Sequence, residues 1–556
     1  MSTKIIAMLA SGSIKWELIF LSAVIIIPSL PYVDQPAHID DPLFLHTARN
    51  IIKNPLDPYG STTNWLGRPE SLFDVFSNPP LFSFYLASVM SIWGENERII
   101  HLACIPFALL AGIGMYFLSR RFCSPALASA VFLVLSPIFF TMSHMMMPDV
   151  ALCAFTICGI LFFILGYDSD NIYLVLLGAF LSGLAPLIRY NGVIAPVLMV
   201  LYVSLHIHRE KIKYIFSLII PILLIVGWNL FTVNEYGKVH FFHHTLFQKY
   251  GTSGLLDILL YFLPHAISLA ACFPLLFLMP LWKKKSALAA LPSFCCALLL
   301  TFLVQTFAHY ALINLILVFI ISYGAIAFII LAVEDLTEKW KQAFPRDSVF
   351  LFLWLVLILS MHNSGIHSAA KYMITALPPV IIISLRSASQ YLNKKMIAAA
   401  IASTLVFGII TATADFQLAN AYKKMAEDAV LRTVQNHSPK YFAGHWGFQY
   451  YMEKYSVSAY SQMDTIPVPS ILSSVSLAWP QKMHSEMETK MKILFQEAYS
   501  GELPFRTMSN TRGFQANFYS YINYLSWKGP DHVVYGVLPF SFSRAPLETL
   551  TVYELK

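Results

Sequence analysis

The sequence has little charge for its length. Of its 556 residues, 12% are charged and 57% are hydrophobic. A soluble domain usually carries about a quarter charged residues, so this chain has too little polar surface to coat a water-soluble globule. Apolar runs of about 17–25 residues, the length that a membrane-spanning helix needs, recur as far as residue 414. The composition therefore predicts a polytopic membrane protein.

Cysteine is also scarce, and several common motifs are missing. The seven cysteines all lie in or beside apolar segments, and none follows residue 415. An odd number in such places argues against a disulfide framework. The sequence contains no P-loop, GxGxxG fingerprint, GxSxG elbow or CxxC pair in a supporting context. No small-residue cleavage site follows the first apolar stretch, which we expect to be an uncleaved span.

Thirteen spans are expected, and the basic residues favour one threading of them. With the N-terminus inside, dense Lys/Arg clusters such as Arg120–Arg121 and Lys283–Lys285 all fall on the cytoplasmic side. The positive-inside rule thus explains the net charge of +6 without a nucleic-acid partner. The run 79–93 is short and opens with two prolines, so we expect an interfacial or re-entrant helix there. The expected spans are 14–33, 98–118, 125–143, 149–166, 171–188, 191–206, 214–232, 256–281, 286–308, 311–333, 348–361, 373–386 and 396–414.

This threading predicts two domains. Residues 1–414 would form the transmembrane domain, with 34–97 as its first outer loop. Residues 415–556 would form an outer soluble domain of α/β or α+β class, since about 140 residues can bury a core of their own. Its aromatic segment could stack on sugars or belong to that core. The aromatic residues are Trp446, Phe448, Tyr450 and Tyr451.

Polar residues return repeatedly to the outer ends of the expected spans. Asp40 and Asp41 form an adjacent carboxylate pair in the first loop. An ionised side chain costs about 2.5–3.5 kcal/mol in hydrocarbon, so these groups should line an aqueous cavity or snorkel to the interface. The histidines at 240, 243 and 244 lack the partner ligands of a strong zinc signal. The other residues of the set are His46, Arg49, Lys53, His144, Asp149, Arg189, Tyr190, Asn191, Lys249, His309, Tyr310, His362, His367, Lys371 and Tyr372.

An ordered series of short motifs resembles the GT-C glycosyltransferases, a class of polytopic membrane enzymes. The nearer relatives are protein O-mannosyltransferases and the aminoarabinose transferase that modifies lipid A. The resemblance covers most of residues 14–390 and implies a lipid-linked sugar donor, typically a polyprenyl-phosphate monosaccharide, used on the outer face. The motifs are HIDDPLFLHTARNI (38–51), NPPL (78–81), WGENERIIHLACIPFALLAG (93–112), MMMPDVALCAF (145–155), PLIRYNG (186–192) and KYMITALPP (371–379).

The resemblance also implies roles for single residues. Asp40 matches the family's catalytic acid, which would act as general base, and a direct displacement would invert the anomeric centre. Asp149 matches a second acidic position, and Arg189 and Lys371 match cations near the donor phosphate. Asp41 is a further catalytic candidate, although this chain has Asp there where Glu is common, and it has a lysine at 371 where arginine is usual. The remaining candidates are Tyr372 for the phosphate and His144, Tyr190 and Asn78 for the substrate.

The predicted partners are the lipid-linked donor, a lipid, glycan or protein acceptor, and membrane lipids. The resemblance leaves a divalent metal open as a cofactor, and we assign it no ligands. The predicted location is a bacterial inner membrane, with the active site and C-terminal domain extracytoplasmic. Two other functions stay open: a transporter or flippase for lipid-linked sugars, and a non-catalytic envelope-assembly scaffold. A transporter should place charges near the bilayer midplane and show repeated halves, and the sequence shows neither.

Overall fold

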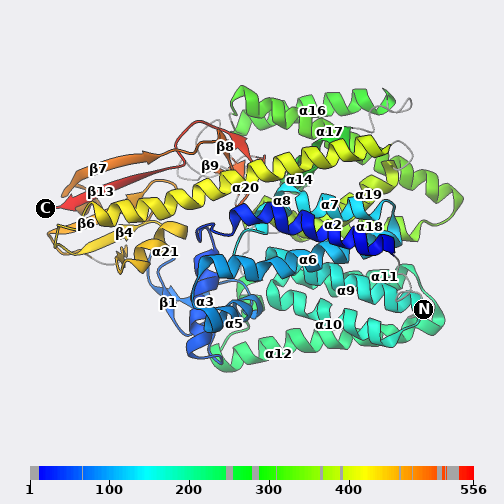
Figure 1. Ribbon diagram of the computed structural model, residues 1–556, viewed down its shortest axis with the longest axis horizontal. Helices are drawn as coiled ribbons and strands as arrows, with labels where there is room; N and C mark the ends of the chain where they lie inside the picture. The colour runs from blue at the N-terminus through cyan, green and yellow to red at the C-terminus, as the bar shows by residue number, and fades with distance from the viewer. Residues whose placement is uncertain are drawn as a thin grey trace.

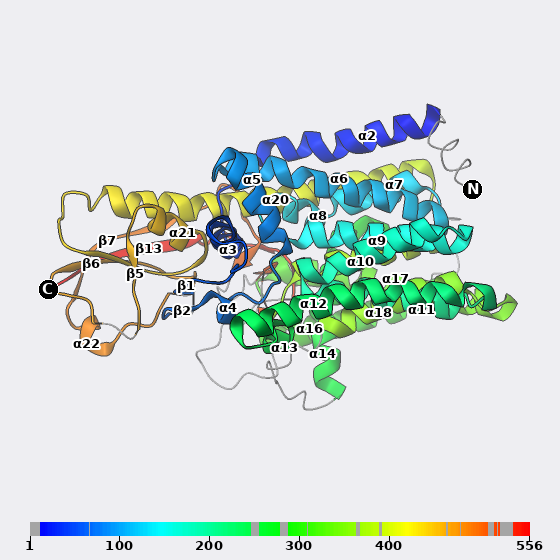
Figure 2. The same ribbon diagram turned by 90° about the horizontal axis from the view of Figure 1, so that it is seen from below.

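The protein is an elongated helical bundle with a β-sheet beyond one end (Figure 1). The computed structural model describes residues 12–65, 67–245, 255–278, 287–308, 310–362, 367–388, 392–462, 465–478, 480–509, 516–519, 521–522 and 537–556. The long helices lie along the bundle axis, while two shorter helices, α3 (Asp41–Lys53) and α5 (Leu81–Trp93), lie at the junction with the sheet. Figure 2 shows the same layout from below, with α2 (Gly12–Ser29) along one edge.

Six of the described helical segments are long and apolar enough to cross a membrane: Ile14–Tyr32, Glu97–Phe122, Asp149–Ser169, Arg209–Tyr236, Leu312–Gln342 and Lys394–Leu431. The chain is therefore a multi-pass membrane protein, as its composition predicts. The other expected spans coincide with further helices and stay predictions as spans, and residues 279–281 and 286 of two of them lie outside the described part of the chain. The remaining helices of the bundle are α7 (Ala126–Leu135), α8 (Pro137–Met142), α10 (Ile172–Ile188), α11 (Ile194–Leu205), α14 (Leu255–Cys272), α15 (Pro274–Leu278), α16 (Ala287–Ala308), α18 (Arg346–His362) and α19 (Leu377–Ala388).

Burial separates the inner helices from the peripheral ones. The apolar window of α9 (Asp149–Ser169) is 83% buried, whereas that of Arg209–Tyr236 is 17% buried. A helix that is apolar on all sides and surrounded by protein belongs to the core of the bundle, and one that exposes the same residues suits contact with lipid chains. The second segment joins η3 (Arg209–Leu218) to α12 (Ile219–Tyr236).

The sheet outside the bundle has five strands in the order β5-β4-β6-β13-β7. Strand β13 pairs antiparallel with β6 and β7, and β4 pairs parallel with β5 and β6. Helix α21 (Trp446–Lys454) connects β4 to β5, and the four aromatic residues singled out above are buried in the hydrophobic core. The strands are β4 (Lys440–Ala443), β5 (Ser458–Ala459), β6 (Ser470–Val475), β7 (Met491–Tyr499) and β13 (Glu548–Leu555).

Short elements complete the described chain. The two-stranded pairs are β1 with β2, β9 with β10, β8 with β12 and β3 with β11. Their bounds are β1 (Thr62–Thr63), β2 (Glu70–Ser71), β3 (His367–Ser368), β8 (Phe505–Arg506), β9 (Met508–Ser509), β10 (Ala516–Asn517), β11 (Tyr521–Ile522) and β12 (Ser541–Phe542). The short helices are η1 (Leu30–Tyr32), α4 (Leu72–Val75), η2 (Tyr190–Val193), α13 (His240–Thr245), η6 (Ala370–Ala376) and α22 (Ser485–Glu488).

The C-terminal region is physically continuous with the bundle. Helix α20 (Lys394–Leu431) runs without a break through residue 414, where the sequence predicts the division between domains, and reaches the sheet in Figure 1. The tail then returns to the bundle, because β11 pairs with β3 and the backbone N–H of Lys371 donates to the carbonyl of Phe518 at 3.1 Å. The predicted domain boundary stays a prediction, and the tail forms part of the surroundings of Lys371.

Candidate active site

Four distant segments bring five of the predicted site residues to the sheet end of the bundle. Asp40 is the N-cap residue of α3, and Asp149 lies in the first turn of α9. Arg189 follows the last residue of α10, and Lys371 and Tyr372 lie in η6. The start of α9 suits an acidic side chain because the helix dipole is positive there.

These residues form two carboxylate–cation pairs. The Nζ atom of Lys371 lies 2.7 Å from Oδ2 of Asp40, and Nη1 of Arg189 lies 2.6 Å from Oδ1 of Asp149. Tyr372 connects the pairs, since its ring centroid is 4.8 Å from the guanidinium carbon of Arg189 and 5.6 Å from Nζ of Lys371. We call these five residues the paired-charge cluster.

Exposure differs sharply within the paired-charge cluster. The side chain of Asp40 is 37% exposed, while those of Lys371 and Asp149 are each 1% exposed. Oδ2 of Asp149 is buried and has no hydrogen-bond partner among the described residues. Buried carboxylate oxygens are normally satisfied, so this oxygen has acceptor capacity that the described residues leave unused. Asp40 is the most exposed of the four charged residues.

The two cations keep the carboxylate of Asp40 ionised. Burial alone would raise the pKa of Asp40, but Lys371 and then Arg189 outweigh it and hold that pKa below its ordinary value. Burial likewise opposes the charge on Lys371, and Asp40 nevertheless raises the pKa of Lys371. The pKa of Arg189 is raised by Asp149 against the effect of burial. At neutral pH the cluster therefore holds an ionised base beside two permanent cations.

The other predicted site residues lie in different surroundings. Asp41, adjacent to Asp40, is 1% exposed and accepts a hydrogen bond from the backbone N–H of His38. The ring of His144 packs on Tyr32, with centroids 4.5 Å apart, and burial lowers the pKa of His144 to about 3. It is therefore uncharged at neutral pH.

Tyr190 and Asn78 have neighbours of their own. The hydroxyl of Tyr190 lies 2.5 Å from Nδ1 of His240, and the carbonyl of Asn78 accepts a hydrogen bond from Tyr59. Within the described part of the chain, neither residue forms a hydrogen bond or ion pair with Asp40, so their substrate roles stay predictions. Among the described residues, no group of three or more His, Cys, Asp or Glu side chains is placed to hold a metal ion.

The remaining polar residues of the predicted set have varied partners. His243 pairs with Asp74 at 2.9 Å, and Arg49 pairs with Glu95 at 2.7 Å. Tyr310 is buried and its hydroxyl accepts from the backbone N–H of Leu538. Lys249 and His309, and the side chains of His362 and His367, lie outside the described residues.

Sequence reasoning missed the buried polar residues behind Asp40. His38 lies 3.1 Å from the carboxylate of Asp415, which also accepts from Gln35 and Thr507, each at 3.1 Å. Tyr519 places its ring 5.4 Å from Nζ of Lys371. Two features of the sequence could have drawn attention to His38 and Asp415. His38 lies three residues before Asp41, and Asp415 directly follows an apolar run that continues as helix.

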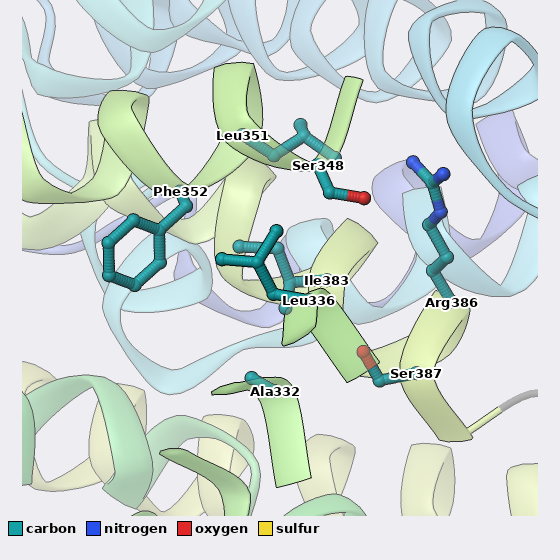
Figure 3. A pocket seen from close by; sticks show the side chains of 8 residues that line it. All are labelled: Ala332, Leu336, Ser348, Leu351, Phe352, Ile383, Arg386 and Ser387. Carbon is teal, nitrogen blue, oxygen red and sulfur yellow. The ribbon is translucent and has the colours of Figure 1, made fainter. Parts of the chain in front are cut away.

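A separate pocket lies towards the other end of α19. Lys371 precedes the first residue of α19, whereas Arg386 lies in its last turn, about 14 Å along the axis from Leu377. Figure 3 shows the guanidinium of Arg386 and the hydroxyls of two serines beside an apolar wall. The lining residues are Ala332, Leu336, Ser348, Leu351, Phe352, Ile383, Arg386 and Ser387. This pocket is distinct from the paired-charge cluster.

Residues 77–228 match the model of a family described as dolichyl-phosphate-mannose-protein mannosyltransferases. The matched range contains Asp149 and Arg189 but neither Asp40 nor Lys371. The resemblance inferred from the motifs is thereby confirmed over this range. No curated protein sequence matches the chain.

Several solved structures resemble the fold at low sequence identity. ArnT from Cupriavidus metallidurans bound to undecaprenyl phosphate is 11% identical, with a TM-score of 0.48, over 84% of this chain and 93% of that one. The oligosaccharyltransferase of Archaeoglobus fulgidus, in complex with Zn and sulfate, is 11% identical, with a TM-score of 0.48, over 80% and 62%. The arabinofuranosyltransferase AftD from Mycobacteria is 11% identical, with a TM-score of 0.44, over 97% and 40%.

Proposed function

We propose that this protein is a membrane glycosyltransferase that moves a sugar from a polyprenyl-phosphate donor to a lipid, glycan or protein acceptor. The observation that carries the proposal is the paired-charge cluster, in which Asp40 and Lys371 lie beside Asp149 and Arg189 at one end of an apolar bundle. The family match over residues 77–228 supports glycosyl transfer as the reaction class.

In this reaction Asp40 is the general base. Its carboxylate takes the proton from the acceptor hydroxyl or amine as that atom forms a bond to the anomeric carbon. The bond between the anomeric carbon and the phosphate oxygen breaks, and polyprenyl phosphate leaves with the electron pair. Lys371 and Arg189 offset the charge that develops on the phosphate, and the displacement inverts the anomeric centre.

Asp149 and the surrounding helices have complementary parts in this mechanism. The unpartnered Oδ2 of Asp149 accepts a hydrogen bond from a sugar hydroxyl, while its Oδ1 holds the guanidinium of Arg189 in place. A long isoprenoid chain can lie between apolar helices while its phosphate reaches the cations. The proposal places this end of the bundle at the extracytoplasmic face of a bacterial inner membrane.

The test is glycosyl transfer by the purified full-length protein in lipid vesicles. The donor probes are undecaprenyl-phosphate monosaccharides with radiolabelled hexoses or pentoses, and the acceptors are membranes from cells that lack the gene. We expect one donor to pass label to a new product, and Asp40→Asn to reduce kcat by about 100-fold or more, which is the usual range for a general base. Full transfer by well-folded Asp40→Asn would remove the proposed base.

A second variant separates the phosphate role from the base role. Arg189→Ala should impair donor use more than acceptor use, because the guanidinium would face the donor phosphate. The measurement is kcat/KM for each substrate, varied in turn at saturating concentration of the other. A larger effect on acceptor use than on donor use would contradict the phosphate role.

A further inference from the structure

A buried ionic group lies directly behind Asp40 and takes no part in the proposed transfer. His38 and Asp415 are both 0% exposed, and Asp41 is 1% exposed. Nε2 of His38 lies 3.1 Å from Oδ2 of Asp415, and its Nδ1 lies 3.8 Å from Oδ2 of Asp41. Burying three ionisable groups is expensive unless they are paired, so their arrangement calls for a reason beyond packing.

The backbone between these residues adopts a conformation that its sequence disfavours. Ile39 has a φ of 50°, in the left-handed region, although it is β-branched and its side chain is buried at 3% exposure. Such a conformation is unfavourable for a non-glycine residue and persists only when its surroundings enforce it. A residue of this kind directly before Asp40 marks a turn that is held in place from outside.

The restraints act on both sides of Ile39. On one side, His38 is paired with Asp415 on α20. On the other, the carboxylate of Asp41 accepts from the backbone N–H of His38, and the N–H of Asp41 donates to the carbonyl of His38, each at 3.1 Å. The turn is thus tied to itself by Asp41 and to the bundle by His38.

The consequence of this turn is visible at Asp40. An aspartate at a helix N-cap usually accepts hydrogen bonds from the first backbone N–H groups. Asp40 holds the N-cap position of α3 but makes no capping bond with its side chain, and its carboxylate contacts Lys371 instead. The turn therefore directs the carboxylate away from its own helix and into the paired-charge cluster.

Asp415 is suited to be the fixed end of this arrangement. Its two oxygens accept hydrogen bonds from Thr507 of the tail and Gln35 of the first loop. The loop is held again one residue before His38, where the backbone N–H of Ala37 donates to the hydroxyl of Tyr451 at 3.1 Å. The anchor thus joins α20, the first loop and the C-terminal region.

We propose that His38, held by Asp415, is a positioning residue that fixes the strained turn at Ile39 and so aims the carboxylate of Asp40. This inference rests on the proposed function, because it assigns His38 a role through the base. It makes the C-terminal region a contributor to catalysis through Asp415 and its partner Thr507. Carboxylate placement affects the chemical step more than the binding of a lipid-linked donor, so the effect belongs in kcat.

The experiment compares His38→Leu, Asp415→Leu and the double variant in the vesicle assay with the undecaprenyl-phosphate sugar that the wild type uses. We expect each single variant to lower kcat per folded protein by about 10- to 100-fold at an unchanged donor KM. Because both residues hold one turn, the double variant should lose no more than the worse single variant. Adding Ile39→Gly to His38→Leu should restore part of kcat, since glycine adopts positive φ without external restraint.

His206→Leu is the matched control, because His206 also pairs with a carboxylate, Asp347 at 3.0 Å, but follows α11 at the other end of the bundle. It should retain the wild-type kcat. If His38→Leu does not accumulate, His38→Gln provides the same comparison with a milder change. Wild-type kcat in the His38 variant, or a changed donor KM at wild-type kcat, would overturn the inference while Asp40→Asn stays inactive. Activity of Asp40→Asn would instead contradict the proposed function itself.

Discussion

At the scale of single residues, the contact between Lys371 and Asp40 links binding to protonation. In the proposed function Lys371 supplies a cation for the phosphate, and it also lowers the pKa of Asp40 against a burial effect that raises that pKa. The wild-type base should therefore stay ionised to below pH ~4, near the ordinary aspartate pKa. The acidic limb of the kcat profile should accordingly lie at low pH.

Removing this cation should move the acidic limb. Lys371→Gln removes the charge that most strongly opposes the effect of burial on Asp40, so the pKa of Asp40 should rise. On acidification, the variant should therefore lose activity at a higher pH than the wild type. The measurement is kcat against pH on the residual transfer. Lys238→Gln, which alters an exposed pair with Asp74, is the control and should leave the limb in place. An unmoved limb in Lys371→Gln would argue against Asp40 as the titrating base.

Asp41 leads to a separate prediction about stability. Burial, opposed by His38, raises the pKa of Asp41 to about 7, so the folded state keeps a proton that the unfolded chain releases near pH ~4. The stability from this group is complete below pH ~4 and is lost as the pH rises through about 7. Asp41→Asn should therefore flatten the decline of Tm between pH ~4 and ~7. An unchanged slope would contradict the protonated state of Asp41.

At the scale of elements, close packing of α9 and α10 brings Asp149 beside Arg189. A Cβ atom at Gly178 would lie 2.4 Å from the backbone nitrogen of Phe163, and one at Gly159 would lie 2.4 Å from Oγ of Ser182. Small residues allow the two helices to approach this closely. The ends of the pair then place the acid at the start of α9 next to the cation after α10.

A bulky residue at this contact should separate the helices. Gly178→Leu should lower Tm and the yield of folded protein, and should reduce kcat/KM for the donor because the Asp149–Arg189 pair opens. Gly227→Leu is the matched control, since no heavy atom lies within 4 Å of the Cβ position at Gly227. Thermal unfolding in detergent and the vesicle assay provide the measurements. Wild-type behaviour of Gly178→Leu would show that this contact does not set the geometry of the site.

At the scale of the whole molecule, the two ends of the bundle carry different polar networks. Helix α6 (Glu97–Phe122) begins near the sheet and carries Arg121 in its last turn, about 36 Å further along its axis. There Arg121 pairs with Asp168 at 2.8 Å and with Asp347 at 2.9 Å, which joins the ends of α6 and α9 to the start of α18. Because Arg121 is far from the paired-charge cluster, its substitution should affect stability and not catalysis.

Arg121→Gln should lower Tm but leave kcat near the wild-type value. Two carboxylates would lose a shared cation, while Asp40 would keep its partner. Arg121→Lys should fall between, because a lysine keeps the charge but cannot hold both carboxylates with a planar fork. Thermal unfolding and vesicle transfer on the same preparations test this. A loss of kcat with an unchanged Tm would contradict the separation.

The extent of sequence-based prediction differs between the helices and the site. The apolar runs predicted a multi-pass membrane protein, and the family match confirms the resemblance over residues 77–228. The motifs also named the members of the paired-charge cluster, although their roles stay predictions. The sequence did not predict that His144 packs on Tyr32. It also did not predict that Asp40 contacts Lys371 while Asp41 contacts His38, because the local backbone decides where adjacent side chains point. Helix α20 runs past residue 414, where the domain boundary is predicted, since a change from apolar to polar residues does not end a helix.

Hydropathy and helix length follow from residues near in sequence, so the chain alone determined that it crosses a membrane and which segments are apolar. Only the tertiary structure decided that Lys371 meets Asp40, 331 positions away, and that Asp415 meets His38. Such contacts depend on how helices pack and where the C-terminal tail returns to the bundle. Side-chain pairing across those distances leaves no periodic pattern, because one contact between two elements constrains only two residues.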